Sequence, residues 1–195
     1  MTAPSSSFPS SRALPLVALF AALTAVFGLI PKIDLPFGVP ITAQTLAVML
    51  AGCLLGPWRG FLAMLLFMVA VAFGLPLLSG GRGGFAVFAA PSAGFLVSWP
   101  LGALAAGLVM RVLPGGSPGR LALSAFAASV VGGIAVLYVF GIAGLVLLAK
   151  LTPLQAATAT LVFVPGDLVK SVLCALVVRT VARGLPDWPF GGRAP

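Results

Sequence analysis

An acid and a base stand three residues apart in one otherwise apolar stretch, Val164-Pro165-Gly166-Asp167-Leu168-Val169-Lys170. In a helix this spacing puts Asp167 and Lys170 on one face. Charges inside a membrane are costly and usually face a cavity or a bundle interior. A structural ion pair between helices is the alternative, although a buried pair is weak support for stability. The pair therefore favours ligand binding, with Lys170 suited to a carboxylate and Asp167 to two N–H groups of a urea-like or amide ligand.

Pro165 predicts a break in the helix just before this pair. A proline cannot donate the backbone hydrogen bond that a continuous helix would send to the carbonyl group of Leu161. Asp167 is then expected in the first turn of the next helical segment. Free N–H groups and the helix dipole favour an anion there, whether its own carboxylate or that of a ligand.

Two further segments carry polar groups that could meet a ligand. The first, Ser79-Gly80-Gly81-Arg82-Gly83-Gly84, sets one arginine among four glycines. It could form an anion-binding nest of backbone N–H groups or a flexible surface turn, and the sequence favours neither. The second is Gln44, at the start of a helix that Thr42 could cap, where a membrane-buried amide needs partners that a ligand could supply.

Several phenylalanines flank these polar segments. As aromatic residues they fit core packing better than a dedicated ligand box. Phe88 is nevertheless kept as a candidate pocket residue, because a ligand with an apolar part needs apolar walls. The group is Phe37, Phe85, Phe88 and Phe95.

Composition indicates that these groups lie within a membrane. The 195 residues are 61% hydrophobic and only 7% charged, which excludes an ordinary soluble domain. Long apolar runs follow one another without the alternation of barrel strands, so an all-α membrane protein is predicted. The first run continues to Pro31 without a convincing cleavage region and is therefore taken as a span rather than a signal peptide. The predicted organisation is a disordered tail at 1–11, a single six-helix transmembrane domain at 12–184 and a short C-terminal tail at 185–195.

Six membrane spans are predicted, at residues 14–30, 42–55, 60–78, 91–113, 120–149 and 153–183. The last two are long enough to tilt or kink, and the last begins with a capping-box pattern from Thr152 to Gln155. Placing both termini in the cytoplasm agrees with the positive-inside rule. That side then holds Arg12, Arg59, Arg111, Arg120, Arg179, Arg183 and Arg193, and the other only Lys32, Arg82 and Lys150.

The residue types argue against several classes of function. The chain has no His and only three acids, with neither a metal motif nor a nucleophile elbow, so no catalytic residue, metal site or cofactor is expected. No Gly-Lys pair occurs, so the Walker lysine is missing. Basic residues are scattered singly, and the net charge of +8 therefore does not indicate nucleic-acid binding. Cys53 and Cys174 fall in apolar runs and are expected to be inert buried thiols.

Several motifs, taken together and in order, resemble those of the BioY family of biotin-uptake proteins. The resemblance spans nearly the whole apolar chain, and this makes it specific where no single motif is. Ser92 and Ala93 depart from it, because Thr and Gly or a similar pair often stand there. The matching segments are Ile30-Pro31-Lys32-Ile33, Leu35 to Gln44, Gly74 to Leu78, Gly80 to Gly84, Pro91 to Phe95, and Pro165-Gly166-Asp167 with Lys170.

This resemblance implies a substrate-binding S component of an energy-coupling factor (ECF) transporter. It implies a six-helix S-component bundle in the inner membrane of a prokaryote, partnered by a transmembrane coupling subunit and two ATPases. The biotin site is expected near the outer face, below the loops after the first and third helices. The candidate biotin contacts are Asp167, Lys170, Gln44, Gly81, Arg82, Gly83, Gly84 and Phe88.

Within that site, Asp167 is expected on the ureido N–H groups of biotin and Lys170 on its carboxylate, with Arg82 on the carboxylate as the alternative. Small residues of the first span place Ala18, Ala21, Ala22 and Ala25 three and four apart. Such a face permits close helix approach to an internal neighbour or to a separate subunit. Ala18 and Ala22 best fit the docking surface that the resemblance implies.

Two other classes of function stay open at this point. One is a stand-alone secondary transporter or facilitator for biotin or another small organic acid or vitamin. The other is a structural subunit that binds no small ligand. The oligomeric state, including a homo-oligomer, is also left open.

Overall fold

The computed structural model describes residues 10–35 and 38–192. Residues 1–9 of the predicted N-terminal tail, Phe37 and Arg193 lie outside the described residues. The last two positions of that predicted tail, Ser10 and Ser11, belong to the first helix. The described chain is built from helices, and its only extended pairings are two isolated bridges, Ile33 with Ile41 and Leu78 with Arg82.

The six predicted spans correspond in order to helices or groups of helices. They are α1 (Ser10–Gly28); α2 (Gln44–Leu55); α3 (Pro57–Ala72); the pair α4 (Ala93–Val97) and α5 (Trp99–Val112); α6 (Pro118–Ser129), the π-helical η2 (Val130–Val136) and α7 (Leu137–Leu148); and the pair α8 (Pro153–Leu161) and α9 (Val164–Gly184). Two 3₁₀ helices, η1 (Phe85–Ala89) and η3 (Phe190–Gly192), lie between or after them.

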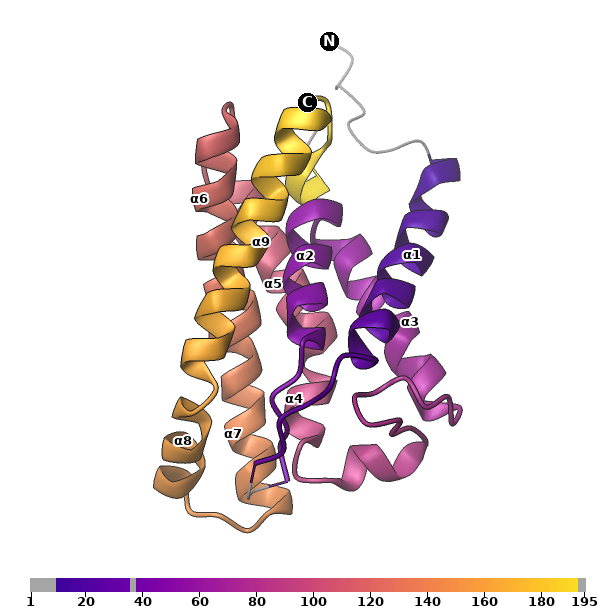
Figure 1. The fold of residues 1–195 in the computed structure, drawn as a ribbon, viewed down its shortest axis with the longest axis vertical. Coiled ribbons are helices and arrows are strands. Elements are labelled where there is room, and N and C mark those ends of the chain that lie inside the picture. The colour runs from indigo at the N-terminus through magenta and orange to yellow at the C-terminus, as the bar shows by residue number, and fades with distance from the viewer. Residues whose placement is uncertain (1–9, 36–37, 193–195) are drawn as a thin grey trace.

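The long helices run side by side, and α1 begins at the same end of the bundle at which α9 ends (Figure 1). The loop after α1, the segment around η1 and the connection between α7 and α8 lie at the other end. A large apolar core joins α1, α2, α3, α5, α6 and α9, and a smaller cluster around Val39, Leu145, Ala156 and Phe163 lies beneath the loop after α1. Cys53 and Cys174 are free thiols buried in the larger core, as predicted.

By length and composition alone, one continuous helix could cross a bilayer, the run of 31 residues from Pro118 to Leu148. The bent pair α8 and α9 would be a second. The apolar parts of α1, α2, α3 and α5 are shorter. The prediction placed the end of α3 at residue 78, which is wrong: the helix ends at Ala72, because Gly74 and Pro76 do not continue it.

The predicted break at Pro165 is present. The axes of α8 and α9 differ by 51°, and Pro165 lies in the first turn of α9. The predicted capping box is also formed at the start of α8, where Thr152 and Gln155 bond each other's backbone N–H groups at 3.3 and 2.9 Å. Asp167 therefore lies in the first helical turn after a rigidly placed break.

The π-helical segment η2 itself lies close to α5. A Cβ atom at Gly132 would lie 2.3 Å from the carbonyl oxygen of Gly102, so only glycine permits the two backbones to approach this closely. Leu137 and Tyr138 follow directly after η2. The close approach thus fixes where Tyr138 enters the bundle.

The segment predicted as a short C-terminal tail is packed against the bundle as far as Gly192. The indole nitrogen of Trp188 donates to the carbonyl oxygen of Leu54 at 2.9 Å, and Phe190 is buried. Arg111 donates from Nε to the carbonyl oxygen of Gly191 at 2.8 Å. These contacts cover the turn between α2 and α3, at the end of the bundle away from the loop after α1.

Candidate functional site

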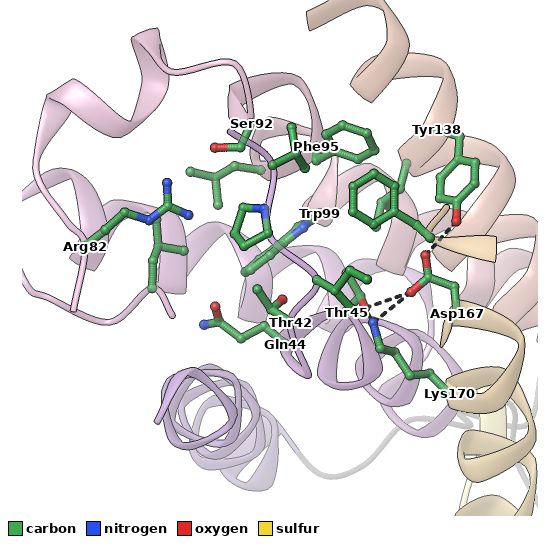
Figure 2. Close-up of a pocket in the computed structure, with 17 residues that line it drawn as sticks. Thr42, Gln44, Thr45, Arg82, Ser92, Phe95, Trp99, Tyr138, Asp167 and Lys170 are labelled. Atoms are coloured by element: carbon green, nitrogen blue, oxygen red, sulfur yellow. Dashed lines mark hydrogen bonds and ion pairs between the residues drawn. The ribbon is translucent and has the colours of Figure 1, made fainter. Parts of the chain in front are cut away.

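A pocket of about 640 Å³, part of which opens to solvent, lies where the loop after α1, the loop after α3 and the break between α8 and α9 meet. Its lining residues come from six parts of the chain: Val39, Pro40, Ile41 and Thr42; Gln44 and Thr45; Leu78 and Arg82; Ser92, Phe95, Leu96 and Trp99; Leu137 and Tyr138; Phe163, Asp167 and Lys170. Figure 2 shows these side chains around the pocket.

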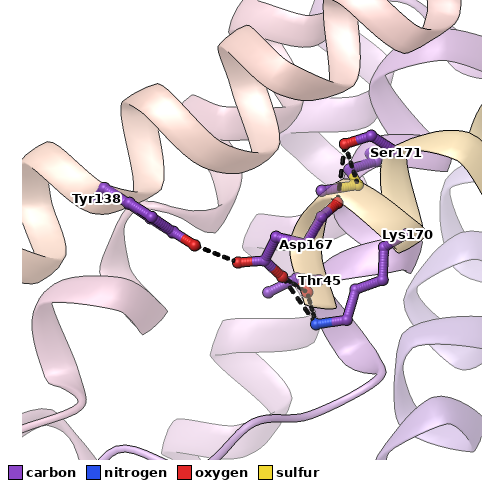
Figure 3. A network of polar contacts seen from close by, with 6 residues as sticks. Thr45, Tyr138, Asp167, Lys170 and Ser171 are labelled. Atoms are coloured by element: carbon purple, nitrogen blue, oxygen red, sulfur yellow. Dashed lines mark hydrogen bonds and ion pairs between the residues drawn. The ribbon is translucent and has the colours of Figure 1, made fainter. Parts of the chain in front are cut away.

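Asp167 is the centre of a four-residue polar network on one side of this pocket (Figure 3). Its Oδ1 atom accepts from Lys170 Nζ at 2.8 Å and from the Thr45 hydroxyl at 3.4 Å. Its Oδ2 atom accepts from the Tyr138 hydroxyl at 2.8 Å. Lys170 also donates to Thr45 Oγ1 at 2.9 Å. Both charges are thus paired and hydrogen-bonded, which is the condition for burying them.

The prediction that Asp167 and Lys170 share one helix face is confirmed. Their side chains are 7% and 14% exposed, and both line the pocket. They also contact each other, so this one pair of side chains is both an ion pair and part of the pocket wall. A ligand would therefore meet an acid and a base whose positions the protein already fixes.

Sequence reasoning missed two members of this network, Thr45 and Tyr138. Tyr138 is the only tyrosine of the chain and interrupts the most apolar of the long runs. Its hydroxyl group, within an apolar run, is the signal that could have indicated a polar contact, since buried hydroxyl groups need hydrogen-bond partners. Thr45 follows Gln44 directly, and no local pattern distinguishes its hydroxyl group from that of any other threonine at the start of a helix.

Gln44 lines the pocket, but the protein supplies all of its hydrogen-bond partners. Its Nε2 atom donates to the carbonyl oxygens of Thr24 and Leu77 at 3.0 and 3.1 Å. Its Oε1 atom accepts from the N–H and hydroxyl groups of Ser79 at 3.1 and 3.3 Å. A ligand is therefore not needed to supply the partners of this amide. Thr42 does not cap the helix either, because α2 begins with Ala43 as its N-cap and no side-chain cap is formed.

Gln44→Leu is expected to lower the thermal unfolding midpoint in detergent by several degrees, because it leaves the buried Ser79 N–H and the Leu77 carbonyl group without partners. Each buried group left unsatisfied costs about 1–3 kcal/mol. The matched control is Gln155→Leu at the only other glutamine, which removes an exposed capping interaction. Equal midpoints for the two variants would contradict the structural role of Gln44.

Three N–H groups of the glycine-rich loop are used within the protein and are not free for the anion nest that was one of its two predicted roles. The N–H groups of Gly81 and Arg82 donate to the Leu78 carbonyl oxygen at 2.9 and 3.2 Å, and that of Gly84 donates to Val71 at 2.8 Å. Gly83 is needed for space, since a Cβ atom there would lie 2.3 Å from the Leu75 carbonyl oxygen. Of the predicted loop residues, only Arg82 lines the pocket, while Gly81, Gly83 and Gly84 do not.

Arg82 lies on the side of the pocket opposite Asp167 and Lys170 (Figure 2). Its Nε atom is 3.5 Å from the Ser79 carbonyl oxygen. The two ion pairs in the described part of the chain are Lys32 with Asp34 and Lys170 with Asp167, so no carboxylate there neutralises Arg82. The pocket thus has a paired acid and base at one end and an uncompensated cation at the other.

Aromatic side chains form the apolar wall between these two ends. Phe95 packs against Tyr138 with ring centroids 6.3 Å apart and against Phe163 at 5.8 Å. Phe88 does not line the pocket and packs against the large core instead. Phe95, for which core packing was the favoured prediction, packs against its neighbours and also lines the pocket. Ser92, which departs from the family pattern, also lines the pocket.

Ala18 and Ala22 are exposed on the outer face of α1, whereas Ala21 is buried against the core. The neighbouring positions on that outer face, Leu14 and Val26, are 74% and 55% exposed. Ala18 and Ala22 are therefore not covered by an internal neighbour within the described chain, whereas Ala21 is. Among the described residues, no three metal-ligating side chains come together.

Comparison with known proteins identifies the family of the chain. The BioY family model matches residues 2–187. A biotin transporter BioY of Rhizobium etli is 49% identical over 92% of this chain and 98% of its own length, and one of Rhodobacter capsulatus is 48% identical over 90% and 96%. The crystal structure of the S component for biotin from an ECF-type ABC transporter covers 91% of this chain and 95% of its own, with a TM-score of 0.80 and 27% identity. The chain therefore belongs to the BioY family, and its bundle has the fold of that S component.

Proposed function

We propose that this chain is the biotin-binding membrane subunit of an uptake system that a separate ATP-hydrolysing module drives. One observation carries the proposal: the pocket presents a paired acid and base at one end, an uncompensated arginine at the other, and aromatic walls between them. Biotin has the same order of groups, with a ureido ring, an apolar bicycle and chain, and a carboxylate. The related proteins named as biotin transporters support this choice of ligand.

The charges favour one orientation of biotin. The Lys170 charge is already matched by Asp167, while Arg82 has no carboxylate partner in the described chain. We therefore place the ligand carboxylate at Arg82, rather than at Lys170 as first expected, and the ureido ring at Asp167, Lys170 and Tyr138. Asp167 accepts from the ureido N–H groups, and Lys170, which has a third N–H beyond those given to Asp167 and Thr45, donates to the ureido oxygen.

The proposed setting is a prokaryotic inner membrane, crossed six times, with both termini in the cytoplasm. The beginning of α1 and the end of α9 at one end of the bundle support this topology (Figure 1). The helices α2 and α5 have 12 and 14 residues and rise about 18 and 21 Å, which is less than a bilayer core of about 30 Å. Adjoining segments must therefore complete those crossings.

The proposed partners are a transmembrane coupling subunit and two ATPases. The exposed face with Ala18 and Ala22 is the proposed contact for the coupling subunit, because small side chains let helices approach closely in a membrane. Reconstituted vesicles with the full module should accumulate biotin on addition of ATP. Equal accumulation in vesicles with this chain alone, driven by a proton gradient, would favour a stand-alone transporter instead.

A thermal-shift scan with a small set of vitamins tests the ligand. Biotin is expected to raise the unfolding midpoint of the purified protein, because a ligand that binds only the folded state stabilises it. Thiamine and riboflavin at the same concentration are expected to leave the midpoint unchanged. Protection by either of them equal to that of biotin contradicts the proposed specificity, and protection by none of the three contradicts a ligand-binding role.

A further inference from the structure

Trp99 carries a buried N–H group with no acceptor in the described chain. The residue begins α5 and is 5% exposed. Among the described residues, its Nε1 atom is the one buried side-chain nitrogen or oxygen without a hydrogen-bond partner. Buried polar groups almost always have a partner, so an exception in a well-packed region calls for an explanation.

The indole is fixed in position, so the free N–H group does not result from loose packing. Its ring lies against Phe67 of α3, with centroids 5.6 Å apart and the ring planes inclined by 32°. Phe67 is itself 1% exposed and belongs to the large core. The donor is therefore held in place before any ligand arrives.

The same residue lines the pocket. In the view of Figure 2, Trp99 lies between the Arg82 side and the Asp167 side of the lining residues. The charged groups of the pocket, Arg82 at one end and Asp167 with Lys170 at the other, leave the middle of the wall to residues such as Trp99. The residue that carries this buried donor thus forms part of the wall of the space that a ligand would fill.

The other two tryptophans show that this situation is particular to Trp99. Trp188 donates from Nε1 to the Leu54 carbonyl oxygen at 2.9 Å, away from the pocket. Trp58 is 65% exposed and reaches the surroundings of the protein. Only Trp99 is both buried and unpartnered, and only Trp99 lines the pocket.

We propose that the Trp99 N–H group donates a hydrogen bond to an oxygen atom of the bound ligand and so determines part of its specificity. This inference rests on the proposed function, because it takes the pocket as the biotin site. An indole N–H can only donate, so it favours a ligand with an acceptor at that point and penalises one that presents a donor. In biotin the accepting oxygen belongs either to the ureido carbonyl group or to the carboxylate.

Indole NMR of the otherwise unaltered protein tests the hydrogen bond directly. With ¹⁵N-labelled tryptophan, the three indole signals are assigned by elimination from Trp58→Phe and Trp188→Phe. Biotin is expected to move the Trp99 N–H proton signal downfield and to leave the Trp188 signal in place. An unmoved Trp99 signal in a sample that binds biotin by calorimetry overturns this inference alone, whereas a sample that binds no biotin refutes the proposed function as well.

Two matched substitutions separate affinity from stability. Trp99→Phe and Trp188→Phe remove the same ring atoms, but only the second leaves a protein acceptor unpaired. Trp99→Phe is expected to weaken biotin binding by about 5- to 100-fold, as for a lost hydrogen bond to a buried group. Trp188→Phe is expected to lower the unfolding midpoint and keep the affinity. Unchanged biotin affinity in a folded Trp99→Phe variant refutes the proposal.

Two analogues identify the accepting oxygen. In one, an imino group replaces the ureido oxygen, and in the other a methyl group replaces the carboxylate. Trp99→Phe is expected to weaken binding of biotin but not of the analogue that lacks the accepting oxygen. With that analogue the hydrogen bond is already absent, so removing its donor changes nothing further. A loss of the same size with both analogues and with biotin shows that neither oxygen accepts from Trp99 and overturns the proposal.

Discussion

Replacing Asp167 with asparagine is expected to weaken biotin binding by about 30- to 4,000-fold, the range for removing one partner of a buried charge pair. Asparagine keeps the size of the side chain but loses the negative charge that neutralises Lys170, 2.8 Å away. It also replaces one of two accepting oxygens with a donor, which then faces the Tyr138 hydroxyl or the ureido N–H groups. Calorimetry on the purified variant measures the effect.

Two controls keep binding apart from folding in this experiment. Asp187→Asn alters an exposed acid beyond the end of α9 and is expected to bind biotin as the parent does. The double variant Asp167→Asn with Lys170→Met removes both charges, so it avoids the unpaired buried lysine and is expected to recover stability without recovering affinity. Unchanged affinity in Asp167→Asn would remove the Asp167 network from the site.

Arg82→Gln is expected to abolish the preference for biotin over its uncharged amide. The parent protein should bind biotin about 10- to 100-fold more tightly than the amide, because a hydrogen bond to a charged group contributes about 1.5–3 kcal/mol. Glutamine retains a donor but no charge, so the variant should bind the two ligands nearly equally. Competition titrations with both ligands measure the ratio.

Lys170→Met and Arg120→Gln are the comparisons for this prediction. Arg120 is an exposed arginine at the start of α6, away from the pocket, and its replacement should leave the ratio unchanged. Lys170→Met should weaken the binding of biotin and of its amide to a similar extent, because Lys170 is placed at the ureido end. A ratio lost in Lys170→Met but retained in Arg82→Gln would reverse the proposed orientation of biotin.

Much of the fold and the centre of the site could be predicted from the sequence because their signals are local. Pro165 removes a backbone donor at a fixed position, and the break between α8 and α9 follows from it. The spacing of Asp167 and Lys170 fixes their common face in the same way. Apolar runs long enough for membrane helices likewise correspond in order to the helices observed.

The role of Gln44 could not be predicted because its partners come from distant parts of the chain. Thr24 and Leu77 are 20 and 33 residues away, and Ser79 is 35 residues away. Nothing in the sequence shows that the end of α1 and the loop after α3 both reach the start of α2. The contact between Tyr138 and Asp167 could not be predicted either, because the two residues are 29 positions apart in the sequence.

The glycine-rich loop shows a different limit. Glycine composition permits an anion nest, but the direction of each N–H group depends on which carbonyl groups are near. The carbonyl groups of Leu78 and Val71 take these N–H groups, so the loop serves to carry Arg82 to the pocket. Composition alone could not separate these outcomes.

A structure of the complex with biotin tests the central claim most directly. The account predicts biotin in the pocket between α2, α5, α7 and α9, with its ureido nitrogens within hydrogen-bond distance of the Asp167 carboxylate and its carboxylate within ion-pair distance of Arg82. Biotin bound with its carboxylate at Lys170, or bound outside this pocket, would contradict the account.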